Sequence, residues 1–241
     1  MLRFVTALIV SVFSAAEMSE AFTAEQLPLE FDARFLTDDE KRFLQAGLAF
    51  QDVYNGMIDG AWGPASQRAL ERYERVNNRD AIVTNDEVVW FAIETYELFE
   101  KQGWVEQYNS GLDMSFLVPS AAIREGSPSD HFVNLELAGT TFGYSLTFSD
   151  ADTRTGLHDY TTREAAAAPY TVRKSDIWIS SGRTKSGVSL YTRSDFRRGG
   201  WSTIMLSASN SDAGILAAVS GSITPGYAPA IGISEGRLVD G

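Results

Sequence analysis

The chain of 241 residues contains no cysteine and only two histidines, His131 and His158. Without cysteine it forms no disulfide bond, no zinc–thiolate site and no cysteine nucleophile. Two histidines leave little material for a metal centre, and a formal net charge of −12 opposes binding to a nucleic-acid backbone. We therefore expect no metal, no cofactor and no nucleic-acid partner. These absences favour a binding or structural protein over an enzyme.

The composition otherwise fits a folded protein with an uneven distribution of charge. Hydrophobic residues make up 44% of the chain, which is enough for a core. Residues 22–110 carry 17 acidic and 8 basic side chains, whereas residues 111–241 carry 13 acidic and 11 basic ones. The first part is therefore the acidic one, and an anionic ligand bound there would depend on local basic side chains rather than on net charge.

The first 21 residues have the pattern of a secretory signal peptide. Arg3 gives a basic start, and residues 4–13 form an apolar run that is too short to span a bilayer as a helix. Small residues then suit cleavage after Ala16 or Ala21. No later segment is apolar over the length that a spanning helix requires. We expect an exported protein, periplasmic or extracellular, with no membrane span after cleavage.

Residues 35–107 have the spacing of apolar residues that is typical of helices. Two segments, Thr37 to Glu40 and Thr84 to Glu87, match the capping box that opens a helix. Pro64 occupies a favourable first helical position between them. Three short helices with brief connections predict a three-helix bundle over this range.

Residues 112–226 predict an α+β domain, because the apolar residues there recur with a period of two. Two helical segments, near 157–167 and 212–220, interrupt the strands, which favours an antiparallel sheet with packed helices. Residues 227–241 are rich in Gly and Pro and predict a flexible tail. The predicted strands are 133–137, 142–148, 170–174, 177–180, 188–194 and 202–208.

A glycine-rich loop between the first two predicted helices carries the most specific pattern in the chain. Upstream of it stands Leu44-Gln45-x-x-Leu48, and the loop and the following helix read Tyr54-x-Gly56-x-Ile58-Asp59-Gly60-x-Trp62-Gly63-Pro64-x-Ser66-x-x-Ala69-Leu70-x-x-Tyr73. This pattern resembles the peptidoglycan-binding-like domain family, which places such a loop between two helices of a three-helix bundle. The chain departs from the family at Asp52, where a glycine often precedes the aromatic residue, and at Tyr73-Glu74, which replaces a frequent Phe-Gln.

The residues of this loop have physical roles that do not depend on the resemblance. Glycines allow positive φ or close backbone approach, Asp59 can accept hydrogen bonds from nearby amides, and Ile58 would pin the loop to the core. On this interpretation the motif specifies the fold and says little about a ligand. The positions expected to make the fold are Gly56, Ile58, Gly60, Gly63, Pro64, Ala69 and Leu70.

The resemblance implies peptidoglycan as the ligand, a polymer of sugars and peptides. Trp62 is then the preferred contact, because an aromatic face stacks on sugar CH groups while its N–H finds a polar partner. Arg68, Arg72 and Arg75 could pair with peptide carboxylates, and Asp59 completes the predicted ligand set. The alternatives are that Trp62 belongs to the loop core and that the arginines are a solvated helix face.

The C-terminal region contains no recognisable catalytic context. Residues 187–191 begin like a nucleophile elbow but lack its final glycine, and no Ser-x-x-Lys or His-Glu-x-x-His occurs. His158 followed by Asp159 could be a base with its orienting partner, although the start of a surface helix explains the pair better. The order of strands and helices is similar to the PsbP-like α/β sandwich, which implies binding or assembly with another envelope protein.

Three hypotheses remain open at this point. The first is an exported, non-catalytic cell-envelope protein that recognises peptidoglycan through its helical domain. The second is an envelope hydrolase with an active site in the C-terminal domain. In the third the helical domain is only a structural brace. A wide apolar arc on the third predicted helix, with Trp90 and Trp104 expected to dock on the C-terminal region, favours the brace.

Overall fold

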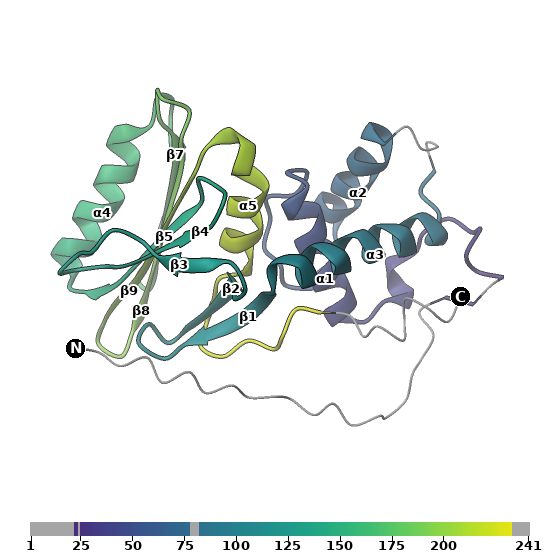
Figure 1. Cartoon of the computed structure of the whole chain (residues 1–241), viewed down its shortest axis with the longest axis horizontal. Helices are drawn as coiled ribbons and strands as arrows, with labels where there is room; N and C mark the ends of the chain where they lie inside the picture. Colours follow the sequence, from purple (N-terminus) through teal and green to yellow (C-terminus); the bar gives the residue numbers. More distant parts are fainter. Residues whose placement is uncertain (1–21, 24, 78–81, 233–241) are drawn as a thin grey trace.

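The computed structural model describes residues 22–23, 25–77 and 82–232. Within these residues the protein is α+β, with five α-helices and two antiparallel sheets (Figure 1). The predicted signal peptide and residues 233–241 of the predicted tail lie outside the described residues. Residues 22–103 are called the helical half below, and residues 104–232 the sheet half.

The helices of the helical half begin where the capping patterns predict. The side chains of Thr37 and Thr84 each accept from a backbone amide three residues on, and Glu40 and Glu87 bond back to the cap amides, so both capping boxes are confirmed. Pro64 is the first residue of its helix, as expected. The elements are η1 (Ala33–Phe35), α1 (Asp38–Phe50), α2 (Pro64–Val76) and α3 (Asn85–Gln102).

The sheet half contains a seven-stranded sheet of order β3-β4-β5-β9-β8-β7-β6 and a three-stranded sheet of order β1-β2-β10. All described strand pairs are antiparallel. The strands are β1 (Trp104–Asn109), β2 (Met114–Pro119), β3 (Ile123–Glu125), β4 (Val133–Leu137), β5 (Gly143–Ser149), β6 (Tyr170–Arg173), β7 (Ile177–Arg183), β8 (Ser189–Arg197), β9 (Gly200–Ala208) and β10 (Thr224–Pro225). The helical segments are α4 (Ala151–Glu164), η2 (Asn210–Asp212) and α5 (Ala213–Ser222).

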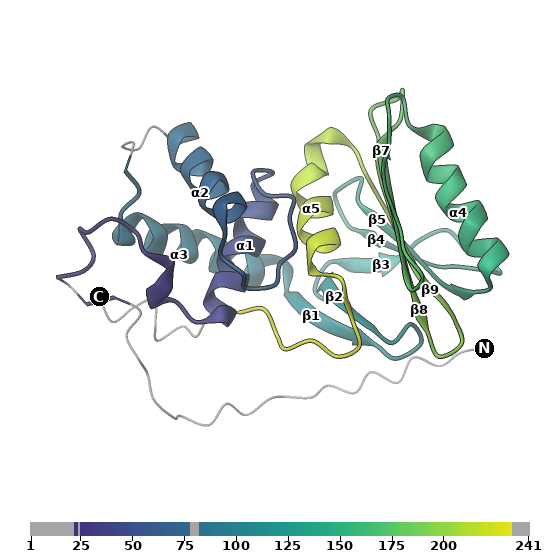
Figure 2. The ribbon, with the colours of Figure 1, turned by 180° about the vertical axis from the view of Figure 1, so that it is seen from behind.

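Helix α5 joins the two halves. It packs against α1 on one side and against β2, β8 and β9 on the other, and Figures 1 and 2 both show it between α1 and the sheet. Helix α4 covers the opposite side of the sheet over β7, β8 and β9. At the α1–α5 contact, a Cβ on Gly214 would overlap the carbonyl of Phe50. Because buried side chains of both halves form one continuous hydrophobic cluster, the halves share a core.

The predicted boundary between residues 107 and 112 falls on structure rather than on a linker. Strand β1 follows α3 directly and pairs with β2 from Trp104↔Pro119 to Asn109↔Met114. Strand β2 is buried at every position, so it lacks the alternation that reveals a half-buried strand. Trp104 is buried as expected, against Phe50 at a ring distance of 4.8 Å, but the expectation for Trp90 was wrong because 59% of it is exposed. The helix that docks on the sheet half is α1.

The first part of the predicted flexible tail is packed against the fold. Ala228 and Ile231 are buried, and Arg42 Nη1 donates to the Pro229 carbonyl at 3.1 Å. The tail therefore runs back from β10 to helix α1 over the described residues. Over all the residues that the structure describes, none of the helices is long and apolar enough to cross a membrane.

Candidate ligand-binding site

A buried glutamine on α1 holds the glycine-rich loop in place. Gln45 Oε1 accepts from the amides of Asp59 (3.1 Å) and Gly60 (2.9 Å), and Nε2 donates to Ala61 O (3.1 Å) and Ser66 Oγ (3.2 Å). Its side chain therefore satisfies loop groups that would otherwise be buried without partners. The motif includes Gln45, but this anchoring role was not predicted; the available signal was a single polar residue within the apolar run of residues 43–50.

Asp59, Gly60 and Ile58 behave as the fold-making interpretation predicts. Asp59 Oδ1 accepts from the Ala61 amide at 2.9 Å, which makes a local turn. Gly60 has φ +80°, and a Cβ there would lie 2.7 Å from the Asp38 carbonyl oxygen. Ile58 is buried, and its amide donates to Gly221 O on α5 at 2.9 Å. The loop is thus fixed to α1 and α5 at once.

The other motif positions meet the fold-making expectation only in part. Ala69 and Leu70 are buried as predicted, and a Cβ on Gly56 would overlap the Tyr54 side chain. Gly63 does not meet the expectation, because its φ is −120° and a Cβ there would meet no atom within 4 Å. It serves as the N-cap of α2 without a side-chain hydrogen bond.

Trp62 lies half-buried beside the N-terminal segment. Its ring meets Phe31 edge to face at 5.6 Å, and Nε1 donates to Gln67 Oε1 at 3.2 Å. These residues line a cavity of about 320 Å³, called the tryptophan cavity below. Its remaining lining residues are Asp32, Ala33, Arg34 and Lys41.

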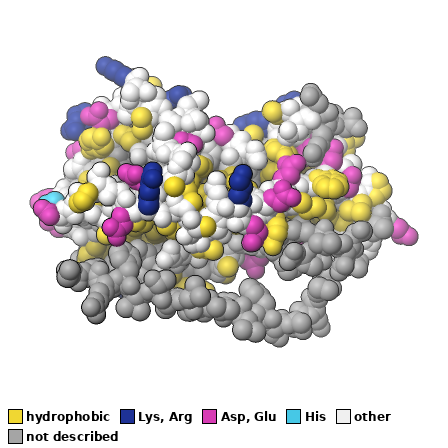
Figure 3. All heavy atoms as spheres, viewed as in Figure 1, with side chains coloured by type: hydrophobic (Ala, Val, Ile, Leu, Met, Phe, Trp, Pro, Cys, Tyr) yellow, Lys and Arg dark blue, Asp and Glu magenta, His cyan; other side chains and the backbone are white. Residues whose placement is uncertain are grey.

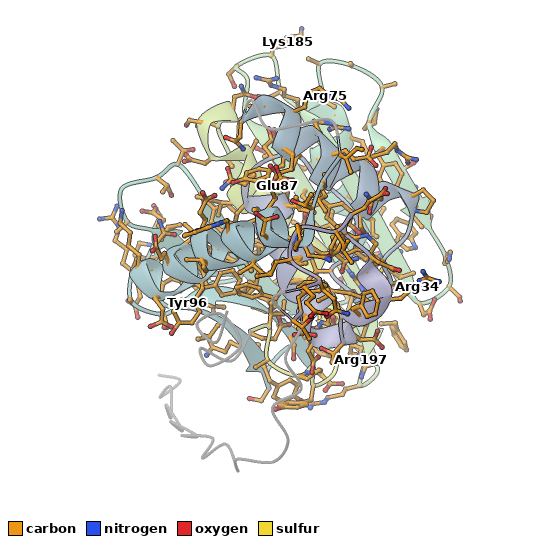
Figure 4. The ribbon with its side chains drawn as sticks, turned by 90° about the vertical axis from the view of Figure 1, so that its right-hand side faces the viewer. Arg34, Arg75, Glu87, Tyr96, Lys185 and Arg197 are labelled. Atoms are coloured by element: carbon orange, nitrogen blue, oxygen red, sulfur yellow. The ribbon has the colours of Figure 1, made fainter. Side chains whose placement is uncertain are left out.

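Arg68 and Arg72 line a different cavity of about 270 Å³, called the arginine cavity below. Arg75 and Asp59 line neither cavity. Figure 4 shows Arg75 on α2 well apart from Arg34 on the N-terminal segment. The structure therefore divides the predicted ligand set between two sides of α2. The remaining residues of the arginine cavity are Asp52, Val53, Tyr54, Asn55 and Ala65.

The two cavities differ in whether their basic side chains already form ion pairs with carboxylates. In the tryptophan cavity Arg34 pairs with Asp32 at 2.5 Å, which lowers the pKa of Asp32 to about 2, and Lys41 pairs with Asp38 at 3.1 Å. Among the described residues, Arg68 and Arg72 have no carboxylate within 4 Å, and Arg72 Nη1 makes one long contact of 3.5 Å to Val53 O. On the face in Figure 3, acidic, basic and hydrophobic side chains are interspersed. The arginine cavity is thus the better place for an anionic group.

His158 lies in the middle of α4 with its side chain buried against the sheet, so the expectation of a surface helix start was wrong. Its Nδ1 lies 2.8 Å from Ser180 Oγ and its Nε2 lies 3.0 Å from Ser194 Oγ. Burial, reinforced by the charges of Arg173 and then Arg154, lowers the pKa of His158 to about 4. Asp159 does not orient this ring, because its carboxylate contacts Arg173 at 3.3 Å. With no exposed surface, His158 has no contact with solvent or substrate in this conformation.

The hydroxyl groups around His158 form a hydrogen-bonded polar layer. Ser194 Oγ also bonds Thr203 Oγ1 at 2.7 Å, which extends the network across β8 and β9. Above it, the Arg154 guanidinium lies 3.7 Å from the centre of the Trp178 ring and 4.2 Å from that of Trp201. These contacts tie α4 to the sheet. Across the described part of the chain, no three His, Asp or Glu side chains are placed to hold a metal ion.

Comparisons with known proteins add no identification. No model of a protein family matches the chain. No curated protein matches its sequence either. The resemblance to the peptidoglycan-binding-like domain family therefore depends on the motif residues alone. The two cavities beside these residues are the candidate binding sites.

Proposed function

We propose that the protein is an exported, non-catalytic cell-envelope protein that recognises peptidoglycan through residues 35–107, arranged as a peptidoglycan-binding-like three-helix domain. The observation that carries the proposal is the arginine cavity beside the glycine-rich loop. Arg68 and Arg72, one turn apart on α2, offer a carboxylate two guanidinium groups that form no ion pair among the described residues. Stem peptides of peptidoglycan carry such carboxylates.

The tryptophan cavity supplies a second contact of different chemistry. Trp62 presents aromatic surface and packs on the buried Phe31, and Gln67, Arg34 and Lys41 surround it with polar groups. Aromatic rings with polar neighbours suit sugars, which offer CH faces and hydroxyl rims. Since α2 contributes to both cavities, the proposal assigns the glycan to the tryptophan cavity and the peptide to the arginine cavity.

The sheet half is proposed to bind another envelope component rather than to catalyse a reaction. Its polar layer is enclosed, and one of its aromatic clusters ends at Phe196, which packs on Trp201 and is 47% exposed. A hydrolase that used His158 as its base would require this side chain to reach a substrate, and all of its surface is covered. A conformational change large enough to lift α4 would be needed for that chemistry.

Sedimentation with purified sacculi tests the proposal. The full chain is expected in the pellet, and the double variant Arg68→Gln/Arg72→Gln in the supernatant. The control Arg75→Gln/Arg183→Gln changes the net charge equally at exposed arginines outside both cavities and is expected to pellet like the original chain. Failure of the original chain to pellet would reject peptidoglycan recognition.

A structural brace is the second candidate, favoured by the contact between α1 and α5. The overlap that excludes a side chain at Gly214 and the Ile58–Gly221 hydrogen bond show close packing between the halves. If the helical half is only a brace, neither the original chain nor any variant pellets in the sedimentation experiment. Gly214→Val should nevertheless destabilise both halves together. Its unfolding in urea, followed by tryptophan fluorescence and by circular dichroism, should then show one coincident transition.

A further inference from the structure

Asp52 stands in an unusual backbone conformation at the edge of the arginine cavity. It follows the C-cap of α1, its φ is +55°, and its amide donates to Ala49 O at 2.9 Å. Glycine adopts this left-handed region at least cost, and Asn and Asp are the residues that tolerate it next best. Backbone conformation alone would therefore favour glycine here, and the chain carries a carboxylate instead.

The Asp52 carboxylate has no partner within the structure. Among the described residues it makes no ion pair or side-chain hydrogen bond, although it lines the same cavity as Arg68 and Arg72. Opposite charges thus border one cavity of about 270 Å³ without coming within 4 Å of each other. A ligand that carries both charges would complete two ion pairs across this gap.

The walls of the cavity restrict the size and type of that ligand. Tyr54 is fixed, because its hydroxyl donates to Met57 O at 2.8 Å, so its ring acts as a rigid wall. The exposed Asn55 adds an amide that can donate and accept. The cavity is at the lower end of the size range of ligand pockets, which begins at roughly 300 Å³, and its lining is polar, so it suits a small polar group.

We infer that the arginine cavity binds an amino-acid zwitterion, with Arg68 and Arg72 holding its carboxylate and Asp52 holding its ammonium group. The free end of a diamino acid in a peptide presents this pair of charges, whereas a sugar or the interior of a peptide does not. The inference deepens the proposed function and rests on it, since it names the part of the stem peptide that the helical half recognises.

Amide chemical shifts of the full chain, recorded with three small probes, test the inference. Diaminopimelate carries two zwitterionic ends, pimelate has the same carboxylates without ammonium groups, and 1,5-diaminopentane has only the ammonium groups. Diaminopimelate is expected to shift residues 52–55 and 65–72 in a saturable way. Pimelate is expected to bind at least tenfold more weakly, and the diamine not at all. Equal binding of diaminopimelate and pimelate would overturn the role of Asp52.

Variants separate recognition from folding. Asp52→Asn keeps a residue that tolerates the left-handed conformation and removes the charge, so its thermal midpoint should stay unchanged while the preference for diaminopimelate over pimelate is lost. Asp52→Gly should do the same with equal or higher stability. Arg68→Gln should weaken both acids, and Arg75→Gln neither. Tenfold preference retained in Asp52→Asn would contradict the inference.

The two proposals fail in distinguishable ways. If sacculi retain the chain but diaminopimelate causes no saturable shift, the zwitterion site is wrong and peptidoglycan recognition stands. If diaminopimelate binds with the expected variant profile but sacculi do not retain the chain, the cavity is an amino-acid site and peptidoglycan recognition is wrong.

Discussion

Glu106 on strand β1 gives the chain a pH dependence of stability that can be worked out from its surroundings. Both carboxylate oxygens are buried and have no hydrogen-bond partner among the described residues. Burial raises the pKa of Glu106 from 4.5 to about 7, and the positive charge of Arg42 offsets only part of this effect. The group is therefore favoured in its neutral form in the folded protein.

The sign of the effect follows from the two pKa values. The unfolded chain releases this proton near pH 4.5, whereas the folded chain holds it until about pH 7. The contribution of Glu106 to stability is therefore fully present below pH 4.5 and is lost as the pH rises through 7. The difference between the two pKa values corresponds to about 3 kcal/mol, at 1.36 kcal/mol for each pKa unit.

The variant Glu106→Gln removes the ionisation and keeps the shape. Urea unfolding should show it to be more stable than the original chain by about 3 kcal/mol at pH 8 and by only about 1 kcal/mol at pH 5. Glu97→Gln, at an exposed glutamate on α3, serves as the control for the loss of one carboxylate and should change the free energy of unfolding by less than about 0.5 kcal/mol. An advantage of Glu106→Gln that is the same at both pH values, or absent at both, would refute the reasoning.

Four further experiments test other parts of the structure. Gln45→Leu removes every hydrogen bond between this side chain and the glycine-rich loop and should lower the free energy of unfolding by about 2–4 kcal/mol, measured in urea; a loss below 0.5 kcal/mol would contradict its anchoring role. Gly60→Ala should cost about 1–3 kcal/mol because of its positive φ and the nearby Asp38 carbonyl, whereas Gly63→Ala should stay within about 0.5 kcal/mol; equal effects would be inconsistent with the two conformations. Arg193→Met should cost about 3–5 kcal/mol because it leaves the buried Asp195, 2.8 Å away, without its partner, and a second change of Asp195→Asn should restore much of the loss. Trp62→Ala should reduce retention by sacculi and leave the affinity for diaminopimelate unchanged, since the two cavities are separate; a parallel loss of both would show that they act as one site.

The sequence could predict the elements whose causes are local. Both capping boxes and the start of α2 at Pro64 depend on residues three or four positions apart, and they lie where expected. Strands β4 and β5 were visible because their apolar residues alternate, and strands β6 to β9 were also predicted at their observed places. Strand β2 was not, because both of its faces are covered by segments distant in the chain.

The sequence predicted several residues of the candidate site, but not how they divide between two cavities. Trp62 and Arg68 are close in sequence, but successive residues of a helix point about 100° apart, so Gln67 lines the tryptophan cavity and Arg68 the arginine cavity. The role of Asp52 depends on a left-handed φ that follows from how α1 ends. The burial of His158 depends on contacts with β7 and β8, 22 and 36 residues away, which no local pattern contains.

Calorimetric titration of the full chain with a purified soluble muropeptide, which carries both the disaccharide and the stem peptide, tests peptidoglycan recognition. We expect saturable binding at one site, which is lost in Arg68→Gln/Arg72→Gln and retained in Arg75→Gln/Arg183→Gln. No saturable binding by the original chain, or equal affinity in the Arg68→Gln/Arg72→Gln variant, would contradict it.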